Sequence, residues 1–132
     1  MYKIDFKSPV HVYFMGIGGI SMSGLAQILI EEGFKVSGSD NKKSEITKAL
    51  EKKGVHIFYV VVNTAAVHPD NPEFAAAKAA ALPMLTRAEL LGQIMKEYEL
   101  PVAIAGTHGK TTTTSMISKI LLEADTDPTL SI

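Results

Sequence analysis

Apolar runs with the character of buried strands alternate with amphipathic helical patterns along most of this chain. Residues 10–16 and 35–40 are strand-like, and each run is followed by apolar side chains at helical spacing, which stop near Gly33 and Gly54 respectively. Consecutive parallel strands need a crossover between them, and a helix usually supplies it. The alternation therefore predicts an α/β fold in which helices cover both faces of a parallel sheet.

Capping residues predict where the later helices begin. Asn71 precedes a proline, and Thr86 has a glutamate three residues later, which is the spacing of a capping box. The alanine-rich residues 74–81 are expected to belong to the first of these helices. We expect a short strand at residues 82–85 and an apolar strand at residues 101–105, which leads into a last helix.

One apolar stretch is too long for this scheme. The run VHIFYVVVNT, residues 55–64, is almost continuously strand-like, whereas neighbouring parallel strands need about a dozen residues between them. Either one long strand lies here, or two strands are joined with their connection missing.

Composition limits the size and the partners of the protein. With 132 residues, of which 46% are hydrophobic, the chain can bury one sizeable core and at most part of another. Its net charge of -1 gives no global field for nucleic acid or an anionic membrane, so any phosphate site has to be local. The lack of cysteine excludes disulfides and thiolate metal sites and agrees with a reducing compartment. No stretch approaches the ~20 apolar residues of a membrane span, so we expect a soluble protein.

A first glycine-rich loop, GIGGISMSG, connects the first strand to the first helix. Gly16, Gly18 and Gly19 would let the backbone pass close to a diphosphate, and the helix start would offer free N–H groups. Asp40, at the end of the second strand, lies where an acceptor for ribose hydroxyls is expected. A tight turn without a ligand is the alternative, because Ser21 replaces the third glycine of the usual pattern. We favour phosphate binding.

Two residues of this segment and one residue of the second strand have other interpretations. Met22 suits core packing at least as well as ligand contact. Ser23 and Ser39 are, on the residues alone, better explained as local backbone caps than as binding groups.

A second glycine-rich loop, GTHGKTTTT, resembles a shortened phosphate-binding P-loop. Lys110 would contact the outer phosphates, the Thr111 hydroxyl would bind Mg²⁺, and Thr112 would contact phosphate. A simple helix cap is the weaker alternative. Thr113 and Thr114 are expected to pack and to bond the backbone, and the role of His108 stays open.

Taken together, the segments GIGGISMSGLA, VSGSD, NTAAVHPDNPE, TRAELL and AGTHGKTTTTSM resemble the Mur ligase family over nearly the whole chain. The resemblance implies a three-domain enzyme with an N-terminal Rossmann-like, doubly wound domain for a UDP-sugar, a central ATPase and a C-terminal domain. Residues 1–100 would be the first of these domains. Residues 101–132 would be the first strand, P-loop and helix of the second.

The resemblance also implies the site residues. Those expected around the UDP-sugar are Gly16, Ile17, Gly18, Gly19, Ile20, Ser21, Met22, Ser23, Ser39, Asp40, Thr64, Ala65, Ala66, Val67 and His68. Those expected around ATP are Gly106, Thr107, His108, Gly109, Lys110, Thr111 and Thr112. Lys110 and Thr111 would act in catalysis, with Mg²⁺ on Thr111.

The implied substrates are UDP-N-acetylmuramate, L-alanine and ATP, with Mg²⁺ as the metal. ATP would phosphorylate the muramoyl carboxylate, and the amine of L-alanine would attack the acyl phosphate, in the cytoplasm. We expect this chain to bind but not to turn over by itself. An NAD(P)-binding oxidoreductase that uses Asp40, and a non-catalytic nucleotide-binding module, are the alternatives.

Two structural expectations follow from the same resemblance. The family has a connection between the strands equivalent to VHIFY and VVVNT, so residues are expected to be missing between about Phe58 and Val61. The last helix should be poorly anchored, so that it leans on the first domain, pairs with another copy of the chain or is disordered.

Overall fold

The computed structural model describes residues 2–59 and 71–130, and it divides the chain into two compact units. The first unit ends at Gln93 and the second begins at Ile94. This division falls inside a helix, so the domain boundary expected at residue 100 stays a prediction. Among the described residues, no helix combines the length and the apolar character that a membrane span requires.

The first unit contains a three-stranded parallel sheet in the order β1-β2-β3. The strands are β1 (His11–Met15), β2 (Lys35–Asp40) and β3 (His56–Tyr59). Phe14 lies opposite Gly38, and Gly38 lies opposite Ile57, so these three positions share one face of the sheet. The parallel α/β architecture predicted from the alternating pattern is confirmed.

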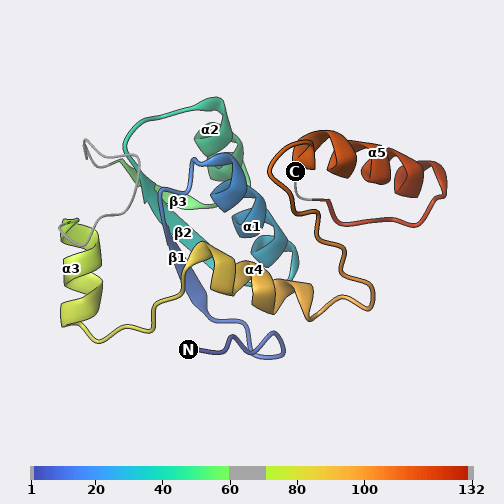
Figure 1. The fold of residues 1–132 in the computed structure, drawn as a ribbon. Helices are drawn as coiled ribbons and strands as arrows, with labels where there is room; N and C mark the ends of the chain where they lie inside the picture. Colours follow the sequence, from blue (N-terminus) through green and yellow to red (C-terminus); the bar gives the residue numbers. More distant parts are fainter. Residues whose placement is uncertain (1, 60–70, 131–132) are drawn as a thin grey trace. The chain divides into compact units, whose positions relative to one another are not determined.

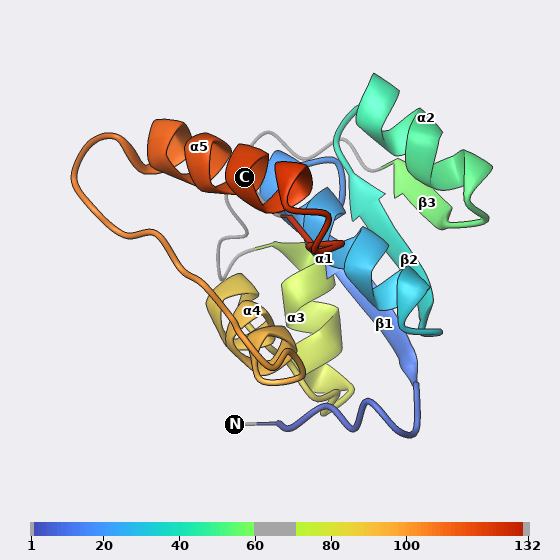
Figure 2. The same ribbon diagram turned by 90° about the vertical axis from the view of Figure 1, so that its right-hand side faces the viewer.

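Helices lie on both faces of this sheet. Figures 1 and 2 show α1 and α2 on one face and α3 on the other. The helices are α1 (Ile20–Glu31), α2 (Glu45–Lys52), α3 (Pro72–Ala79), α4 (Arg87–Met95) and α5 (Lys110–Glu123).

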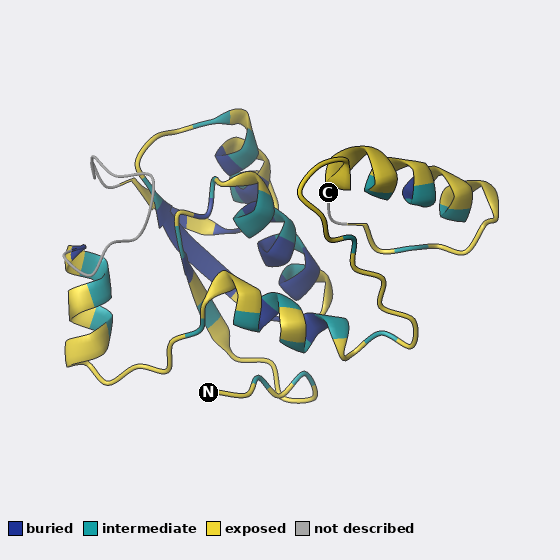
Figure 3. Ribbon diagram, in the orientation of Figure 1, coloured by how far each residue is buried: buried dark blue, intermediate teal, exposed yellow. Residues whose placement is uncertain are grey.

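The hydrophobic core lies between the sheet and the pair α1 and α2 (Figure 3). Its buried members include Phe14, Val36 and Ile57 from the strands and Leu25 and Leu50 from the helices. Burial of this apolar surface is the main stabilising contribution to the first unit. The apolar residues that indicated strands and helices in the sequence pack against one another on this face of the sheet.

The opposite face of the sheet is only partly covered by the described residues. Tyr13 and Phe58 lie on it with 43% and 49% of their surfaces exposed, and α3 contributes no buried residue. Helices lie on both faces as expected, but the cover on this face is thin because the alanine-rich α3 has short side chains that bury little surface.

One carboxylate attaches α3 to this face. Glu73 accepts a hydrogen bond from the Tyr13 hydroxyl at 3.0 Å and another from the Ser39 hydroxyl at 2.7 Å. Burial raises the pKa of Tyr13 above its ordinary value, and the hydrogen bond and negative charge of Glu73 raise it further.

The predicted helix ends are confirmed. The Asn71 side chain accepts from the backbone amides of Glu73 and Phe74, and Thr86 and its glutamate three residues on form a reciprocal capping box. Gly33 and Gly54 end their helices with φ of +86° and +88°, which glycine adopts without strain.

Both extra strands expected from the sequence are wrong. Residues 82–85 and 101–105 have no strand structure, because a strand needs a neighbour to share its backbone hydrogen bonds and the described residues offer none beside them. The helix expected over residues 74–81 ends at Ala79. The break expected between Phe58 and Val61 falls mostly on residues 60–70, outside the described residues.

The last helix, α5, buries little surface, as expected. Ser118 is its only buried residue, while Met116 and Ile120 are 63% and 65% exposed. A helix in this state gains little from packing, and its stability depends on its own hydrogen bonds and caps.

We predict opposite effects of alanine at two glycines of the first unit. A Cβ on Gly38 would lie 2.6 Å from the Phe14 carbonyl oxygen, so Gly38→Ala should lower the free energy of unfolding by about 1–3 kcal/mol. Gly92, inside α4, has open space around it, so Gly92→Ala should raise that free energy by about 0.5–1 kcal/mol. Urea unfolding measures both, and equal effects would contradict the packing of Phe14 against Gly38.

We also predict that Glu73→Gln lowers the pKa of Tyr13 toward 10.0, because the variant removes the negative charge that opposes ionisation. A raised pKa in the folded protein stabilises it below pH 10, and this contribution is lost as the pH rises through the raised value. NMR titration of the tyrosine ring carbons measures the change. Glu45→Gln, on the other side of the sheet, should leave the Tyr13 titration unchanged, and an equal shift there would refute the assignment.

Candidate functional site

The first glycine-rich loop is fastened to the end of β2. The amides of Gly16 and Ile17 both donate to the carbonyl oxygen of Ser39, each at 2.9 Å. Gly16 has a φ of +74°, in the region that favours glycine, and turns the chain out of β1. The loop therefore lies where the carboxyl ends of the parallel strands meet, the usual place for ligands in open α/β sheets.

Asp40 anchors the middle of this loop. Its Oδ2 accepts a hydrogen bond from the Gly18 amide at 2.7 Å, and its Oδ1 accepts from the amides of Asn41 and Lys42. A Cβ on Gly18 would lie 2.6 Å from Asp40 Oδ2 and 2.9 Å from the Thr47 side chain. Both carboxylate oxygens of the expected ribose acceptor are thus engaged with the backbone, and the absence of a side chain at Gly18 permits this.

The start of α1 presents free backbone donors. The helix is capped by Gly19 without a side-chain hydrogen bond and has no acidic residue in its first turn. Among the described residues, the amides of Ile20, Ser21 and Met22 meet no acceptor, whereas the Ser23 amide donates to Gly19. Free N–H groups and the positive end of the helix dipole together favour an anion here.

Two serines near this loop have hydrogen-bond partners within the protein. The Ser23 hydroxyl donates to the carbonyl of Ile20 at 2.8 Å, and the buried Ser39 hydroxyl donates to Glu73. Both hydroxyls therefore have protein partners. The Ser23 bond matches the local backbone role that the residues alone suggested, whereas that interpretation is wrong for Ser39, whose hydroxyl bonds a side chain 34 positions away. The UDP contacts implied by the resemblance stay a prediction.

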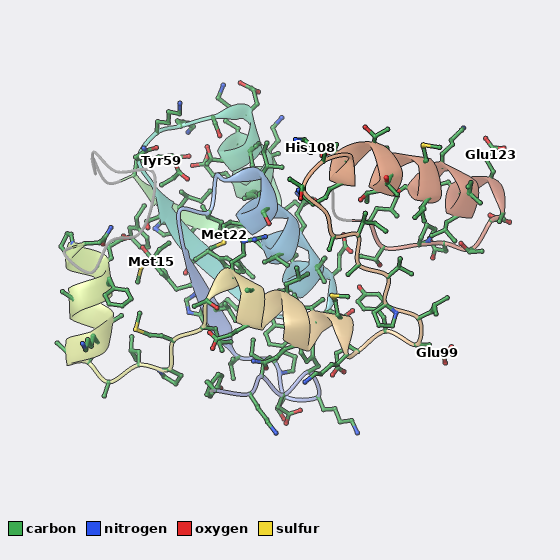
Figure 4. The ribbon with its side chains drawn as sticks, viewed as in Figure 1. Met15, Met22, Tyr59, Glu99, His108 and Glu123 are labelled. Atoms are coloured by element: carbon green, nitrogen blue, oxygen red, sulfur yellow. The ribbon has the colours of Figure 1, made fainter. Side chains whose placement is uncertain are left out.

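The three apolar residues expected at the UDP site differ in exposure. Ile17 is fully buried beside Gly38, Ile20 is 75% exposed, and Met22 lies half-buried in the first turn of α1 (Figure 4). The remaining expected contacts, Thr64, Ala65, Ala66, Val67 and His68, lie outside the described residues.

Arg87, at the first position of α4, also reaches this loop. Its Nη1 donates to the Ser21 hydroxyl at 2.7 Å. Arg87 was not among the site residues expected from the sequence, although it is the only arginine in the chain and lies in the segment TRAELL that contributes to the family resemblance.

The second glycine-rich loop repeats the arrangement of free donors in the second unit. Gly109, with a φ of +78°, precedes α5, and the Thr113 amide donates to its carbonyl at 2.9 Å. Among the described residues, the amides of Lys110, Thr111 and Thr112 meet no acceptor. The Nζ of Lys110 folds back onto the carbonyl of Gly106 at 2.5 Å.

The side chains around this second loop are mostly exposed. Thr111 and Thr112 have exposed side chains, and His108 lies in the turn just before α5 (Figure 4). The Thr114 hydroxyl donates to the carbonyl of Lys110 at 2.7 Å, which confirms its expected role in bonding the backbone. Within the described ranges, no three histidine or acidic side chains come together as a metal site.

Known proteins resemble this chain over its whole length. A UDP-N-acetylmuramate–L-alanine ligase of Agathobacter rectalis is 64% identical over 144 aligned positions, which cover 100% of the chain and 31% of that relative. The ligase of the same name from Acetivibrio thermocellus is 58% identical over 98% of the chain and 30% of its own length. The chain thus spans about a third of the length of these curated relatives. The 144 aligned positions exceed the 132 residues of the chain by 12, so within the aligned region the first relative has residues that the chain lacks.

Solved structures share the fold. A UDP-N-acetylmuramate-alanine ligase from Thermotoga maritima superposes with a TM-score of 0.76 at 32% identity, covering 89% of this chain and 30% of that one. A murein peptide ligase from Psychrobacter arcticus gives 0.77 at 28% identity, covering 87% and 27%. A UDP-N-acetylmuramate:L-alanyl-gamma-D-glutamyl-meso-diaminopimelate ligase from Neisseria meningitides gives 0.72 at 33% identity, covering 89% and 40%.

These matches confirm the Rossmann-like fold that the resemblance implied. The sequence profile described as "Mur ligase family, catalytic domain" matches residues 11–99, which is more than half of the chain and includes the first glycine-rich loop, Asp40 and Arg87. The chain belongs to the Mur ligase family.

Proposed function

We propose that this chain is the UDP-sugar-binding N-terminal part of an ATP-dependent ligase that joins L-alanine to UDP-N-acetylmuramate in peptidoglycan synthesis in the cytoplasm. The observation that carries the proposal is the loop of residues 16–19, which is hydrogen-bonded to the end of β2 and leads into three free amides at the start of α1. The names of the curated relatives, at up to 64% identity, support L-alanine as the amine.

The first loop would hold the diphosphate. The amides of Ile20, Ser21 and Met22 would donate to its oxygens, and the glycines would let it approach the backbone. Asp40 would fix the shape of the loop through Gly18, and residues 64–68 would lie near the uridine. UDP-N-acetylmuramate is named for two of the three solved neighbours, which differ in the amine component, so the nucleotide side of the proposal has the broader support.

The second loop would hold ATP. Lys110 would move from the Gly106 carbonyl to an outer phosphate, and the exposed Thr111 hydroxyl fits a Mg²⁺ ion whose other ligands are phosphate and water. ATP with Mg²⁺ would transfer its γ-phosphoryl group to the muramoyl carboxylate, and the L-alanine amine would then displace phosphate from the acyl carbon. Lys110 would stabilise the negative charge on the transferred group.

The chain alone would bind its nucleotide sugar without completing this reaction. It covers 31% of the first relative, and no acidic or histidine cluster lies near the second loop among the described residues.

Isothermal titration tests the proposed function. We expect the chain to bind UDP-N-acetylmuramate and not NADH, and to form no product when ATP, Mg²⁺ and L-alanine are added. Gly18→Ala should weaken UDP-N-acetylmuramate binding by at least about tenfold, because the added Cβ displaces Asp40 and distorts the loop.

Gly92→Ala is the matched control, because it adds the same methyl group in open space, and it should bind like the unaltered chain. NADH binding without UDP-N-acetylmuramate binding would contradict the proposal and favour an oxidoreductase.

A further inference from the structure

Arg87 is placed beside the free amides of the first loop by a contact between residues far apart in the sequence. Its guanidinium donates to the hydroxyl of Ser21, 66 positions away, at 2.7 Å. Ser21 belongs to the first turn of α1, where the free amides lie. The guanidinium therefore stands at the edge of the surface proposed to hold a diphosphate.

Positive charge accumulates at this solvent-exposed position. Arg87 occupies the first position of α4 and touches the first turn of α1, so its positive charge lies at the positive ends of two helix dipoles. Glu89 already compensates the start of α4, since its carboxylate bonds the Thr86 amide at 2.7 Å and this bond lowers its pKa. No ion pair within residues 2–59 and 71–130 includes Arg87.

Among the described residues, the neighbouring carboxylate of Asp40 forms no ion pair with Arg87. Both oxygens of Asp40 bond backbone amides of the loop and of the residues that follow β2. The remaining donors, three amides and one guanidinium, are of the kinds that bind phosphate oxygens at a helix start and in a bidentate arginine contact.

We propose that Arg87 binds the diphosphate of the UDP-sugar and supplies the local positive charge of this site. The proposal rests on the proposed function and adds a residue to it. The residue type supports this role, because Arg87 is the only arginine and every other basic residue counted among the 13 is a lysine. A planar guanidinium contacts two phosphate oxygens at once, whereas an ammonium acts as a point charge.

Titrations of UDP and uridine into the chain and its variants test the proposal. Arg87→Gln should weaken UDP binding by about 10- to 100-fold and leave uridine binding within about twofold, because only UDP carries the phosphates that the guanidinium contacts. Arg87→Lys keeps the positive charge but cannot contact two phosphate oxygens at once, so its UDP affinity should lie between those of the unaltered chain and Arg87→Gln. UDP affinity should also depend less steeply on salt in Arg87→Gln than in the unaltered chain.

Lys53→Gln is the matched control. It removes one positive charge and one side-chain contact to α1, since Lys53 Nζ donates to Gln27 Oε1 at 3.2 Å, and it should leave UDP binding unchanged. Equal UDP affinity in the unaltered chain and in Arg87→Gln would overturn the role of Arg87 while leaving the proposed function intact.

Two further results would also overturn the role of Arg87. One is a parallel loss of uridine and UDP binding in both Arg87 variants, which would show that the residue only supports the loop. The other is an unaltered chain that binds neither UDP nor UDP-N-acetylmuramate, which would overturn the proposed function as well.

Discussion

The carbonyl group of Ser39 holds together the part of the first unit on which the site depends. It accepts hydrogen bonds from the amides of Gly16 and Ile17, so the end of β2 fixes the point where the chain leaves β1. Asp40, the next residue, fixes Gly18 in the same way. The direction of α1, and with it the position of the free amides, depends on these three hydrogen bonds.

The side chains around this junction explain why small residues are needed there. Gly38 lets Ile17 and the Phe14 carbonyl approach β2, and Gly18 lets the Asp40 carboxylate reach the loop. The buried side of the junction belongs to the core, and its exposed side presents the donors. Packing and the proposed ligand recognition thus share the same short stretch of backbone, which ties the shape of the candidate site to the stability of the first unit.

Features determined by neighbouring residues could be predicted from the sequence. The caps at Asn71 and Thr86 and the helix ends at Gly33 and Gly54 are local, and all are confirmed. The expected strands at residues 82–85 and 101–105 are wrong, because a strand also depends on a partner that local patterns do not specify.

The candidate site divides in the same way. Both glycine loops could be found from their spacing, and the structure gives each a helix start with free amides. The bond between Asp40 and Gly18 and the approach of Arg87 to Ser21 join residues 22 and 66 positions apart, and no sequence pattern encodes them. Sequence could therefore locate the backbone donors and the Asp40 side chain, but not the contact that Asp40 makes with Gly18 or the one that Arg87 makes with Ser21.

The two loops differ in preorganisation, although their free amides are alike. The first loop is bonded to Ser39 and Asp40 of β2 through amides other than the free ones, so a ligand would meet donors that are already held in place. The second is closed by the bond from Lys110 to Gly106 within the loop itself, and α5 buries little surface. A phosphate at the second loop has to exchange that internal bond for its own. Part of its interaction free energy is thereby consumed, so equal contacts would give weaker binding there than at the first loop.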